Sequence, residues 1–496
     1  MNAPLTTPRT TPGTVLWLLL AVAYVLRVAT AIAWPNIHWP DEIYLMTEHA
    51  HRMLFGYGIV TWEWRLGMRP WLIPSLLAVL IGGGDAMGLG PNGYAAIVAM
   101  AMSALSLSVV AVGAGLGMRS LGTAGALVVG GLCAVWFELV YFAPKTSTEV
   151  IAGHILVIAV WFVLTRPDRL LLIGALLGTC FVVRFHTTPM LAVAALWTCG
   201  FDIRRKWPWL ILGALIPIGV QAVVDWGTMG LPLQSIWRYF WINIMEQRAA
   251  AYGVMPAYWY LGRLLVIWGP ILPFLLVAAI LGTRRAPLLA AMVVAHVAAH
   301  TLIGHKEERL LFPALPLLII LAGLGICEVM SRTGIFRRAP GRAAAITLLC
   351  LAALSVFGGA RDGFAGNWSK MSGGLYATDF LRERQDLCGI GLLHGPGWLG
   401  YWFPGGGYYR LHRPVPFFIG EDAGELARFA PGFNYASLPQ PIGDQLPGYE
   451  RLRCWPGEMN SSRTADAPPW CVYRRTGACA ADAPGQINDR LRELGE

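Results

Sequence analysis

Residues 15–34 read VLWLLLAVAYVLRVATAIAW, and residues 38–64 read HWPDEIYLMTEHAHRMLFGYGIVTWEW. The first stretch is apolar over about 20 residues, which is long enough to cross a hydrocarbon core of roughly 30 Å. The second stretch sets two carboxylates, Asp41 and Glu42, side by side just after that crossing ends. Adjacent carboxylates repel each other and hold water, so they indicate either a solvated helix cap or a reacting group at the membrane surface.

The composition shows that apolar runs of this kind make up much of the chain. Of 496 residues, 56% are hydrophobic and 14% are charged, and the mean hydropathy is +0.53. These values exclude an ordinary soluble globular protein and predict a polytopic, mainly α-helical membrane protein. The net charge of +9 comes from short basic clusters between apolar runs, which argues against nucleic-acid binding. The sequence contains no P-loop, no GxGxxG after a strand and no CxxC motif.

Basic clusters at residues 166–169, 204–206, 284–285 and 337–342 separate the apolar runs. Under the positive-inside rule such clusters stay on the cytoplasmic side. With them inside, we expect eleven crossings, an uncleaved first span, a cytoplasmic N-terminus, and a re-entrant or interfacial helix at 69–83. The predicted crossings are residues 15–35, 94–116, 121–143, 149–165, 169–184, 189–202, 207–224, 263–283, 286–303, 310–330 and 343–360.

This threading divides the chain at about residue 360. We expect a membrane domain at 1–360, with external loops at 36–93 and 225–262. Residues 361–496 are rich in glycine, proline and aromatic residues and are expected to form a small extracytoplasmic α/β domain. Almost every unusual polar group then lies on one face of the membrane. Four cysteines in the external part permit one or two disulfides in an oxidising compartment: Cys388, Cys454, Cys471 and Cys479.

The residues after the paired carboxylates have the spacing of an amphipathic helix. Ile43, Met46 and Leu54 recur on one face, so we expect a helix that lies on the membrane surface. Asp41 and Glu42 occupy its first turn, where the helix dipole favours anions. They could simply cap this helix. Alternatively, one could act as a general base at the lipid–water boundary, because partial burial raises the pKa of a carboxylate toward its working range.

A second polar group lies in HVAAHTLIGHKEERLLFPALP, residues 296–316. His296 and His300 are one helical turn apart and could hold a metal with Glu307, but no established ligand spacing accompanies them, and we expect no metal site. The charged part could be a solvated turn, or it could bind a membrane-anchored phosphate through its cations. The cations expected at this level of the membrane are Lys145, Arg184, His305, Lys306 and Arg309.

Two charged residues, Arg27 and Glu138, lie inside predicted crossings. At the centre of a membrane helix each costs about 2.5–3.5 kcal/mol on insertion scales. Both are nearer an end than the middle, so either an interior hydrogen-bonded role or a functional role is expected.

Four further motifs follow HWPDE in order along the chain. They are TWEWRLGMRPWLIP (61–74), RFHTTP (184–189), YGVMPAYWYL (252–261) and HKEERLLFPALP (305–316). Together they resemble the mannosyltransferases that extend GPI anchors and the lumenal arms of asparagine-linked glycans, which form glycosyltransferase family 22 of the GT-C fold. The resemblance covers residues 15 to about 360. Trp39, Pro70 and Leu310 depart from the family pattern.

The resemblance implies a reaction and a set of residues. The donor would be a polyprenyl-phosphate sugar, with mannose as the expected sugar, transferred with inversion to a glycolipid or glycan acceptor. Asp41 matches the acidic catalytic position and Glu42 lies beside it; no metal or other cofactor is expected. A carboxylate can take the acceptor's proton while cations stabilise the departing phosphate. Sugar and acceptor contacts are expected from Trp62, Glu63, Arg69, Tyr252, Trp259 and Glu308.

Two other functions stay open. A GT-C enzyme could transfer a different polyprenyl-phosphate sugar, because the motifs do not fix the sugar. A transporter of lipid-linked sugars would need polar residues at mid-membrane and internal repeats, and the sequence shows neither. With only four lysines beside 34 arginines, the chain is expected to come from a GC-rich bacterial gene. Its site is then expected on the periplasmic side of the inner membrane, or on the lumenal side of the ER if the source is eukaryotic.

Overall fold

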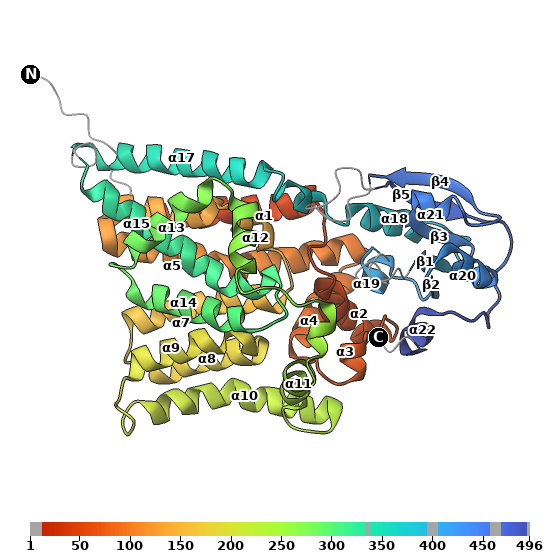
Figure 1. Cartoon of the computed structure of the whole chain (residues 1–496), viewed down its shortest axis with the longest axis horizontal. Coiled ribbons are helices and arrows are strands. Elements are labelled where there is room, and N and C mark those ends of the chain that lie inside the picture. Colours follow the sequence, from red (N-terminus) through yellow and green to blue (C-terminus); the bar gives the residue numbers. More distant parts are fainter. Residues whose placement is uncertain (1–11, 334–337, 394–404, 457–467, 494–496) are drawn as a thin grey trace, which may run out of the picture.

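The computed structural model describes residues 12–333, 338–393, 405–456 and 468–493. In Figure 1 most of the long helices lie roughly parallel in a bundle, and a domain with a β-sheet lies beyond one end of that bundle. A layer of short helices, α2 (Glu48–Phe55), α3 (Trp62–Arg65) and α11 (Gln234–Phe240), lies at the same end. The polar loops between the long helices therefore meet the sheet domain.

Six described helices are long and apolar enough to cross a membrane, and one bent pair makes a seventh. Helix α12 (Trp259–Trp268) and helix α13 (Ile271–Gly282) form the bent pair, with an angle of 111° between them. Helix is present in each of the eleven segments predicted as crossings. The long helices are α1 (Pro12–Ala33), α5 (Gly90–Val135), α7 (Thr148–Thr165), α10 (Trp207–Met229), α15 (Leu315–Ser331) and α17 (Pro340–Ala360). The shorter apolar helices are α4 (Leu72–Ala86), α8 (Leu170–Val183), α9 (Thr188–Cys199) and α14 (Pro287–Leu302).

Helix α5 is a hairpin rather than one rod. Its backbone leaves the helical region at Leu121 and Gly122, where Gly122 has φ of +61°. A side chain is disfavoured in that conformation, which glycine adopts freely. Beyond the turn the two arms pack closely, because a Cβ added at Gly117 would collide with the carbonyl group of Gly125. The two predicted crossings 94–116 and 121–143 are therefore antiparallel arms.

Small residues allow close contact elsewhere in the bundle as well. A Cβ at Gly174 in α8 would collide with the carbonyl of Leu210 in α10, and one at Gly325 in α15 would collide with that of Ala278 in α13. In lipid, where the hydrophobic effect does not drive helices together, close backbone packing of this kind holds them. Arg27 donates to the carbonyl oxygens of Ala23, Cys133 and Ala134 at 2.9–3.1 Å, which confirms an interior hydrogen-bonded role.

The helix predicted to lie on the membrane surface is covered by protein as far as His51, whereas Met53 and Leu54 near its end are exposed. A π-helix, η1 (Glu42–Thr47), precedes α2, and the residues from Tyr44 to His51 are buried all round. Leu45 and Met46 belong to one apolar cluster with Tyr409 of α19 (Gly407–Leu411) and residues of α4. The apolar spacing was a correct sign of burial, but periodicity could not tell a membrane from a neighbouring domain.

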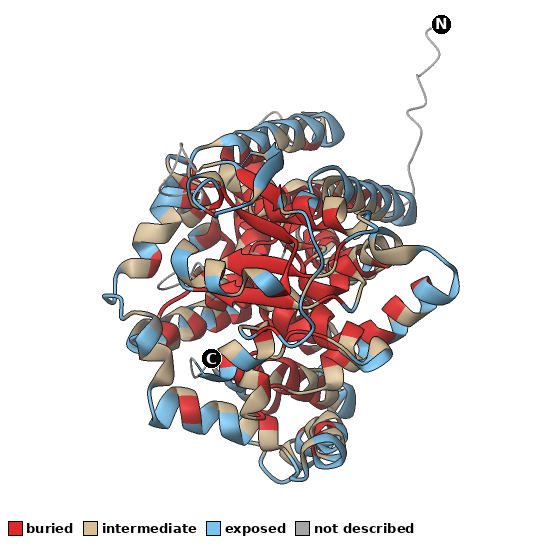
Figure 2. Cartoon of the chain, turned by 90° about the vertical axis from the view of Figure 1, so that its right-hand side faces the viewer, coloured by how far each residue is buried: buried red, intermediate tan, exposed pale blue. Residues whose placement is uncertain are grey.

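The C-terminal domain contains a mixed five-stranded sheet in the order β2-β1-β3-β5-β4. Strand β1 pairs in parallel with β2 and β3, whereas β5 runs antiparallel to β3 and β4. Figure 2 views this end of the molecule and shows buried strands at its centre. The strands are β1 (Ile390–Leu393), β2 (Phe417–Gly420), β3 (Tyr435–Pro439), β4 (Glu450–Trp455) and β5 (Trp470–Arg474). The helices around the sheet are α18 (Ser372–Arg382), α20 (Ala423–Arg428), α21 (Gln440–Gly443) and α22 (Ile487–Glu493).

The sheet domain is fixed internally by disulfides and externally by the first loop. Two disulfides join Cys388 to Cys479 and Cys454 to Cys471. Tyr44 and Ile59 of the first loop belong to the same hydrophobic cluster as β1 and β2. The buried carboxylate of Glu48 accepts hydrogen bonds from the backbone N–H groups of Ile59, Tyr408 and Tyr409 at 2.8–3.2 Å. The first loop is thus held against the sheet domain.

Candidate functional site

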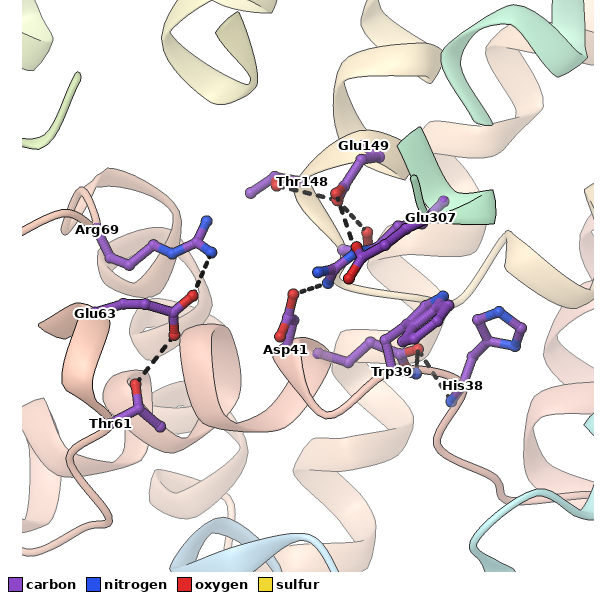
Figure 3. Close-up of polar contacts among 12 residues, drawn as sticks. His38, Trp39, Asp41, Thr61, Glu63, Arg69, Thr148, Glu149 and Glu307 are labelled. Atoms are coloured by element: carbon purple, nitrogen blue, oxygen red, sulfur yellow. Dashed lines mark hydrogen bonds and ion pairs between the residues drawn. The ribbon is translucent and has the colours of Figure 1, made fainter. Parts of the chain in front are cut away.

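Asp41 lies at the start of η1, where the chain turns away from α1. Pro40 begins this turn, and its carbonyl accepts the N–H groups of Ile43 and Tyr44 at 2.9 Å. The Asp41 side chain is 26% exposed and forms an ion pair with Arg309. In Figure 3 it points toward the group that contains Glu149 and Glu307. Sequence and structure therefore agree that this carboxylate faces the basic motif.

Arg309 connects Asp41 to two further carboxylates. Its guanidinium group contacts Glu307, and its Nε lies 3.7 Å from Glu149. Glu149 also forms an ion pair with Arg184, with the two atoms 2.9 Å apart, and accepts hydrogen bonds from the hydroxyl groups of Ser147 and Thr148. The outcome is an alternating chain of charges, in which each guanidinium group is held in place by at least one carboxylate.

Glu42 has a different environment from Asp41. It is buried, and its Oε1 accepts the backbone N–H groups of His38 and Trp39 at 3.1 and 3.0 Å. Its Oε2 lies 3.3 Å from the nitrogen of Lys145, which also donates to two oxygens of Asn36 at 2.7 Å. Burial lowers the pKa of Lys145, and the ion pair with Glu42 opposes this effect. Glu42 therefore holds the turn before Asp41, with one oxygen on the backbone and the other on Lys145.

The five predicted phosphate-binding cations do not form one open basic pocket. Ion pairs join Arg184 to Glu149, and His305 and Arg309 to Glu307. Lys145 forms an ion pair with Glu42. Lys306 donates to the carbonyl oxygens of Thr301 and Ile303 at the C-terminal end of α14, where a cation is favoured. The structure thus gives four of these cations a carboxylate partner and Lys306 two backbone carbonyls.

His305 is the predicted cation whose pKa is shifted upward. Burial lowers the pKa, but hydrogen bonds to Glu307 and to the Gly253 carbonyl, 3.0 Å away, outweigh burial, so the net shift is upward. His296 and His300 each use one ring nitrogen on a carbonyl oxygen, of Leu310 and His296 respectively, and among the described residues the other ring nitrogen of each has no partner. Among the described residues there is no group of three or more metal-ligating side chains.

The predicted sugar-binding residues fall into two separate groups. Glu63 accepts from Arg69 at 2.7 Å, and Arg69 and Arg184 both lie over the ring of Tyr239 at 5.1 and 5.5 Å. Trp62 is buried against Met68 and Ile242. The Glu63–Arg69 pair is drawn apart from the Glu149 cluster in Figure 3, with Asp41 between them.

The second group lies on the other side of the charge chain. Glu308 pairs with Arg263, whose guanidinium group lies 6.0 Å from the ring of Trp259. Tyr252 ends the short helix η4 (Arg248–Tyr252), and its side chain lies outside the described residues.

A cavity of about 90 Å³ lies between α12, α14 and α15. Arg263, Glu308 and Arg309 line its charged part, and His38 borders it with a buried Nε2 that has no partner. Burial and the nearby Lys370 hold the pKa of His38 well below its usual value. The apolar walls include Leu264, Ile267, Val293, Val297, Leu315 and Leu318. This is an amphipathic cavity with cations at one end.

Glu138 contributes a carboxylate to the wall of this cavity. Its Oε2 accepts from the indole N–H groups of Trp136 and Trp268 at 3.0 and 2.6 Å. A larger cavity, of about 400 Å³, lies on the Glu42 side, between the ends of α1 and α5 and the sheet domain. Asn36, Lys145 and Arg410 line its polar part. Glu42 thus lines the larger cavity, whereas Asp41 lines neither and contacts the smaller one through Arg309.

Sequence reasoning missed several charged residues of the site. Glu149 follows the KTST turn at the start of an apolar run, which is the same signal that singled out Asp41. Lys370 follows the last long helix, and only its being one of four lysines distinguishes it. Neither residue belongs to a motif by which the family was recognised.

Comparisons with known proteins identify the family of the chain. The model of the Alg9-like mannosyltransferase family matches residues 16–83 and 95–359. GPI alpha-1,2-mannosyltransferase 3 of Danio rerio is 26% identical over 328 residues, covering 63% of this chain and 59% of that protein. GPI mannosyltransferase 3 of Yarrowia lipolytica is 28% identical over 325 residues, with 62% of each chain covered. The chain therefore spans about three fifths of the length of these relatives.

A solved structure shares the overall fold. The crystal structure of ArnT from Cupriavidus metallidurans bound to undecaprenyl phosphate aligns with a TM-score of 0.60 and 14% identity, covering 94% of this chain and 99% of that one. At this identity the likeness shows the fold, which is GT-C. The family model covers well over half of the chain, so this multi-span membrane protein belongs to the Alg9-like mannosyltransferase family.

Proposed function

We propose that this protein transfers mannose from a polyprenyl-phosphate donor to a glycolipid or glycan acceptor, with Asp41 as the general base. The observation that carries the proposal is the placement of a partly exposed carboxylate beside Arg309, which lines the charged end of an apolar cavity. Such a site brings a base, a cation and a lipid-compatible wall together. Enzymes of the matched family give mannose as the sugar.

The donor fits the smaller cavity by its chemistry. A polyprenyl chain needs apolar walls, and its phosphate needs hydrogen-bonding cations. The wall formed by α12, α14 and α15 supplies the former, while Arg263 and Arg309 supply the latter. The structural neighbour was solved with undecaprenyl phosphate, which supports a lipid-linked donor for this fold.

The reaction we propose is a single displacement. The acceptor oxygen forms a bond to the anomeric carbon while the bond from that carbon to the phosphate oxygen breaks. Asp41 accepts the acceptor's proton, and the lipid phosphate leaves with the bonding electrons. Cations near Arg309 stabilise the charge that develops on the phosphate. The acceptor sugar is expected near Glu63, Arg69 and Tyr239, which border the Asp41 side of the charge chain.

We propose eleven membrane crossings with this site on the extracytoplasmic face. Two disulfides in the sheet domain support an oxidising compartment. The connection between α9 and α10, which carries Arg204 and Arg205, lies at the opposite end of the bundle, as expected for a cytoplasmic loop. Cysteines introduced at Asp85 should react with an external reagent, whereas those introduced at Arg204 should not. External labelling of both positions would contradict this orientation.

A transfer assay tests the function. Purified protein is incubated with radiolabelled polyprenyl-phosphate mannose and a membrane lipid extract, and labelled product is separated from donor. We expect transfer of label to the acceptor fraction. Transfer only from a different polyprenyl-phosphate sugar would identify a GT-C enzyme of another specificity. Movement of label across vesicles without a new glycosidic bond would identify a transporter instead.

A further inference from the structure

Most cations around Asp41 already have carboxylate partners. Arg184 pairs with Glu149, Arg263 with Glu308, and Lys145 with Glu42. Arg309 itself is shared among three carboxylates. An incoming phosphate must therefore compete with these pairs for hydrogen bonds, and a site that binds an anion needs at least one cation without such a partner.

Lys370 is a cation of this kind, and it comes from outside the family match. It follows α17, eleven residues beyond the last matched residue, 359. Among the described residues, no carboxylate oxygen lies within 4.0 Å of its nitrogen. Its nitrogen lies 4.9 Å from the centre of the Trp39 ring. The guanidinium group of Arg309 lies 5.2 Å from the same ring. The indole ring of Trp39 thus contacts two cations, and Trp39 lies two residues before Asp41 in the sequence.

The backbone holds Lys370 in this place. Its carbonyl accepts the N–H group of Ile37 at 3.0 Å, which ties it to the segment between α1 and Asp41. The preceding short helix η6 (Ala365–Ser369) is fixed by Trp368, whose indole donates to the Gly359 carbonyl at 2.9 Å. The ring of Trp368 also packs against Tyr141 with centroids 5.2 Å apart. These contacts fix the backbone of the segment that carries the Lys370 side chain.

Lys370 lines neither cavity, but its charge interacts with charges that border both. Burial lowers its pKa to about 8; Glu308 and Glu42 oppose this effect, while Lys145 and Arg263 add to it. Arg263 and Glu308 line the smaller cavity, and Glu42 and Lys145 line the larger one. An anion that reached this point would stabilise the ammonium group and would relieve its repulsion from the neighbouring cations.

We propose that Lys370 binds the phosphate group of the lipid donor together with Arg309. This inference rests on the proposed function, because it takes a polyprenyl phosphate as the ligand. It assigns a donor contact to the C-terminal part of the chain, so the membrane domain alone would not complete the donor site.

Binding of undecaprenyl phosphate, a lipid phosphate without a sugar, tests the proposal directly. Isothermal titration in detergent should give a Kd for Lys370→Met that is on the order of ten- to a hundredfold higher than that of the unmodified protein, the effect of losing one charge-assisted hydrogen bond. Lys370→Arg keeps the charge and should recover most of the affinity. The uncharged polyprenol should bind all proteins equally, because it lacks the phosphate.

Lys206→Met is the matched control. Lys206 lies in the connection between α9 and α10, at the opposite end of the bundle, and donates to the Thr198 carbonyl at 3.2 Å. It should leave the Kd within about twofold of the original. The thermal transition of each variant checks folding independently of binding.

Three results would contradict the inference and can be told apart. If the unmodified protein and Lys370→Met bind the lipid phosphate equally, Lys370 is not a phosphate ligand, although the donor class stands. If the unmodified protein does not bind lipid phosphate at all, the donor class fails, and the role of Lys370 fails with it. Equal losses in Lys370→Met and Lys370→Arg would also exclude a role for the charge.

Discussion

Asp41 and Glu42 are neighbours in the sequence but belong to two different regions of the site. Asp41 faces the charge chain of Arg309, Glu149 and Arg184, beside the smaller cavity. Glu42 faces the larger cavity and forms a buried pair with Lys145. The Asp41 side chain is 26% exposed, whereas that of Glu42 is 7% exposed. A substrate can reach the first carboxylate, while the second has its oxygens occupied.

This difference explains why one stretch carries two carboxylates. Glu42 accepts the backbone N–H groups of His38 and Trp39, which fixes the turn that presents Asp41. A base needs an accessible oxygen, and a structural carboxylate needs saturated hydrogen bonds. The two roles are therefore divided between adjacent residues, and variants can separate them.

Replacing Asp41 with asparagine should have the largest effect on catalysis. Asp41→Asn keeps the shape of the side chain but removes its basic oxygen, so turnover should fall by roughly 10²–10⁴-fold. The affinity for undecaprenyl phosphate should not fall, because Asp41 is not a phosphate ligand and its carboxylate competes with the phosphate for Arg309. Near-normal turnover would remove Asp41 from the role of base. The measurement is the steady-state rate of mannose transfer.

Replacing Lys145 with methionine should affect stability instead. Lys145→Met leaves Glu42 buried without its counter-charge, and breaking a buried ion pair costs about 3–5 kcal/mol. The thermal transition should fall sharply, while turnover per folded molecule should stay within about tenfold of the original, since the pair does not touch the reacting atoms. Scanning fluorimetry and transfer kinetics on the same sample report both quantities.

A double variant provides the control for this prediction. Glu42→Gln combined with Lys145→Met removes both charges and should recover part of the lost stability. If Lys145→Met left the transition unchanged, the Glu42 region would not be structural, and the contrast with Asp41 would fail.

The pH dependence of donor use should reflect Lys370. Burial lowers the pKa of this group to about 8, so the charge is present below about pH 8 and is lost above it. We expect kcat/KM for the donor to fall by about tenfold or more as pH rises from 7 to 10. In Lys370→Arg this alkaline fall should disappear, because arginine stays charged. If kcat/KM still fell at alkaline pH in Lys370→Arg, the titration would belong to another group.

Replacing Glu48 should have the smallest effect. Burial raises the pKa of Glu48 to about 7, and hydrogen bonds from the Ile59, Tyr409 and Tyr408 backbones oppose this shift. Glu48→Gln would turn an amide N–H₂ group toward at least one of these donors, at a cost of about 1–2 kcal/mol. Limited proteolysis should then cut between α17 and the sheet domain more readily. Equal proteolysis would show that apolar contacts alone hold the first loop against the sheet domain.

The sequence predicted the helical part of the fold well because apolar length is a local property. Every predicted crossing contains helix, although the break at Leu121 and Gly122 lies within the first two residues of the predicted segment 121–143. The environment of residues 44–51 was predicted wrongly, because the same apolar spacing serves a membrane surface and a protein interior. Residue Tyr409, which covers this segment, is more than 350 positions away in the chain.

The site was predicted in part for a similar reason. Motifs placed Asp41 and Arg309 at one level of the membrane, and the structure joins them. Sequence periodicity does not give side-chain distances, so it could not identify Glu149 and Glu307 as the partners of Arg309. The position of Lys370 near the site is set by the path of the chain after α17. Sequence patterns outside the family match did not reveal that path.

Single displacement assisted by Asp41 is the central claim, and the anomeric configuration of the product tests it most directly. The unmodified protein is supplied with a β-linked polyprenyl-phosphate mannose, and the product is analysed by NMR at the anomeric centre. One displacement inverts this centre, so an α-linked mannose is expected. A β-linked product would contradict the claim, because retention requires a second displacement through a covalent intermediate.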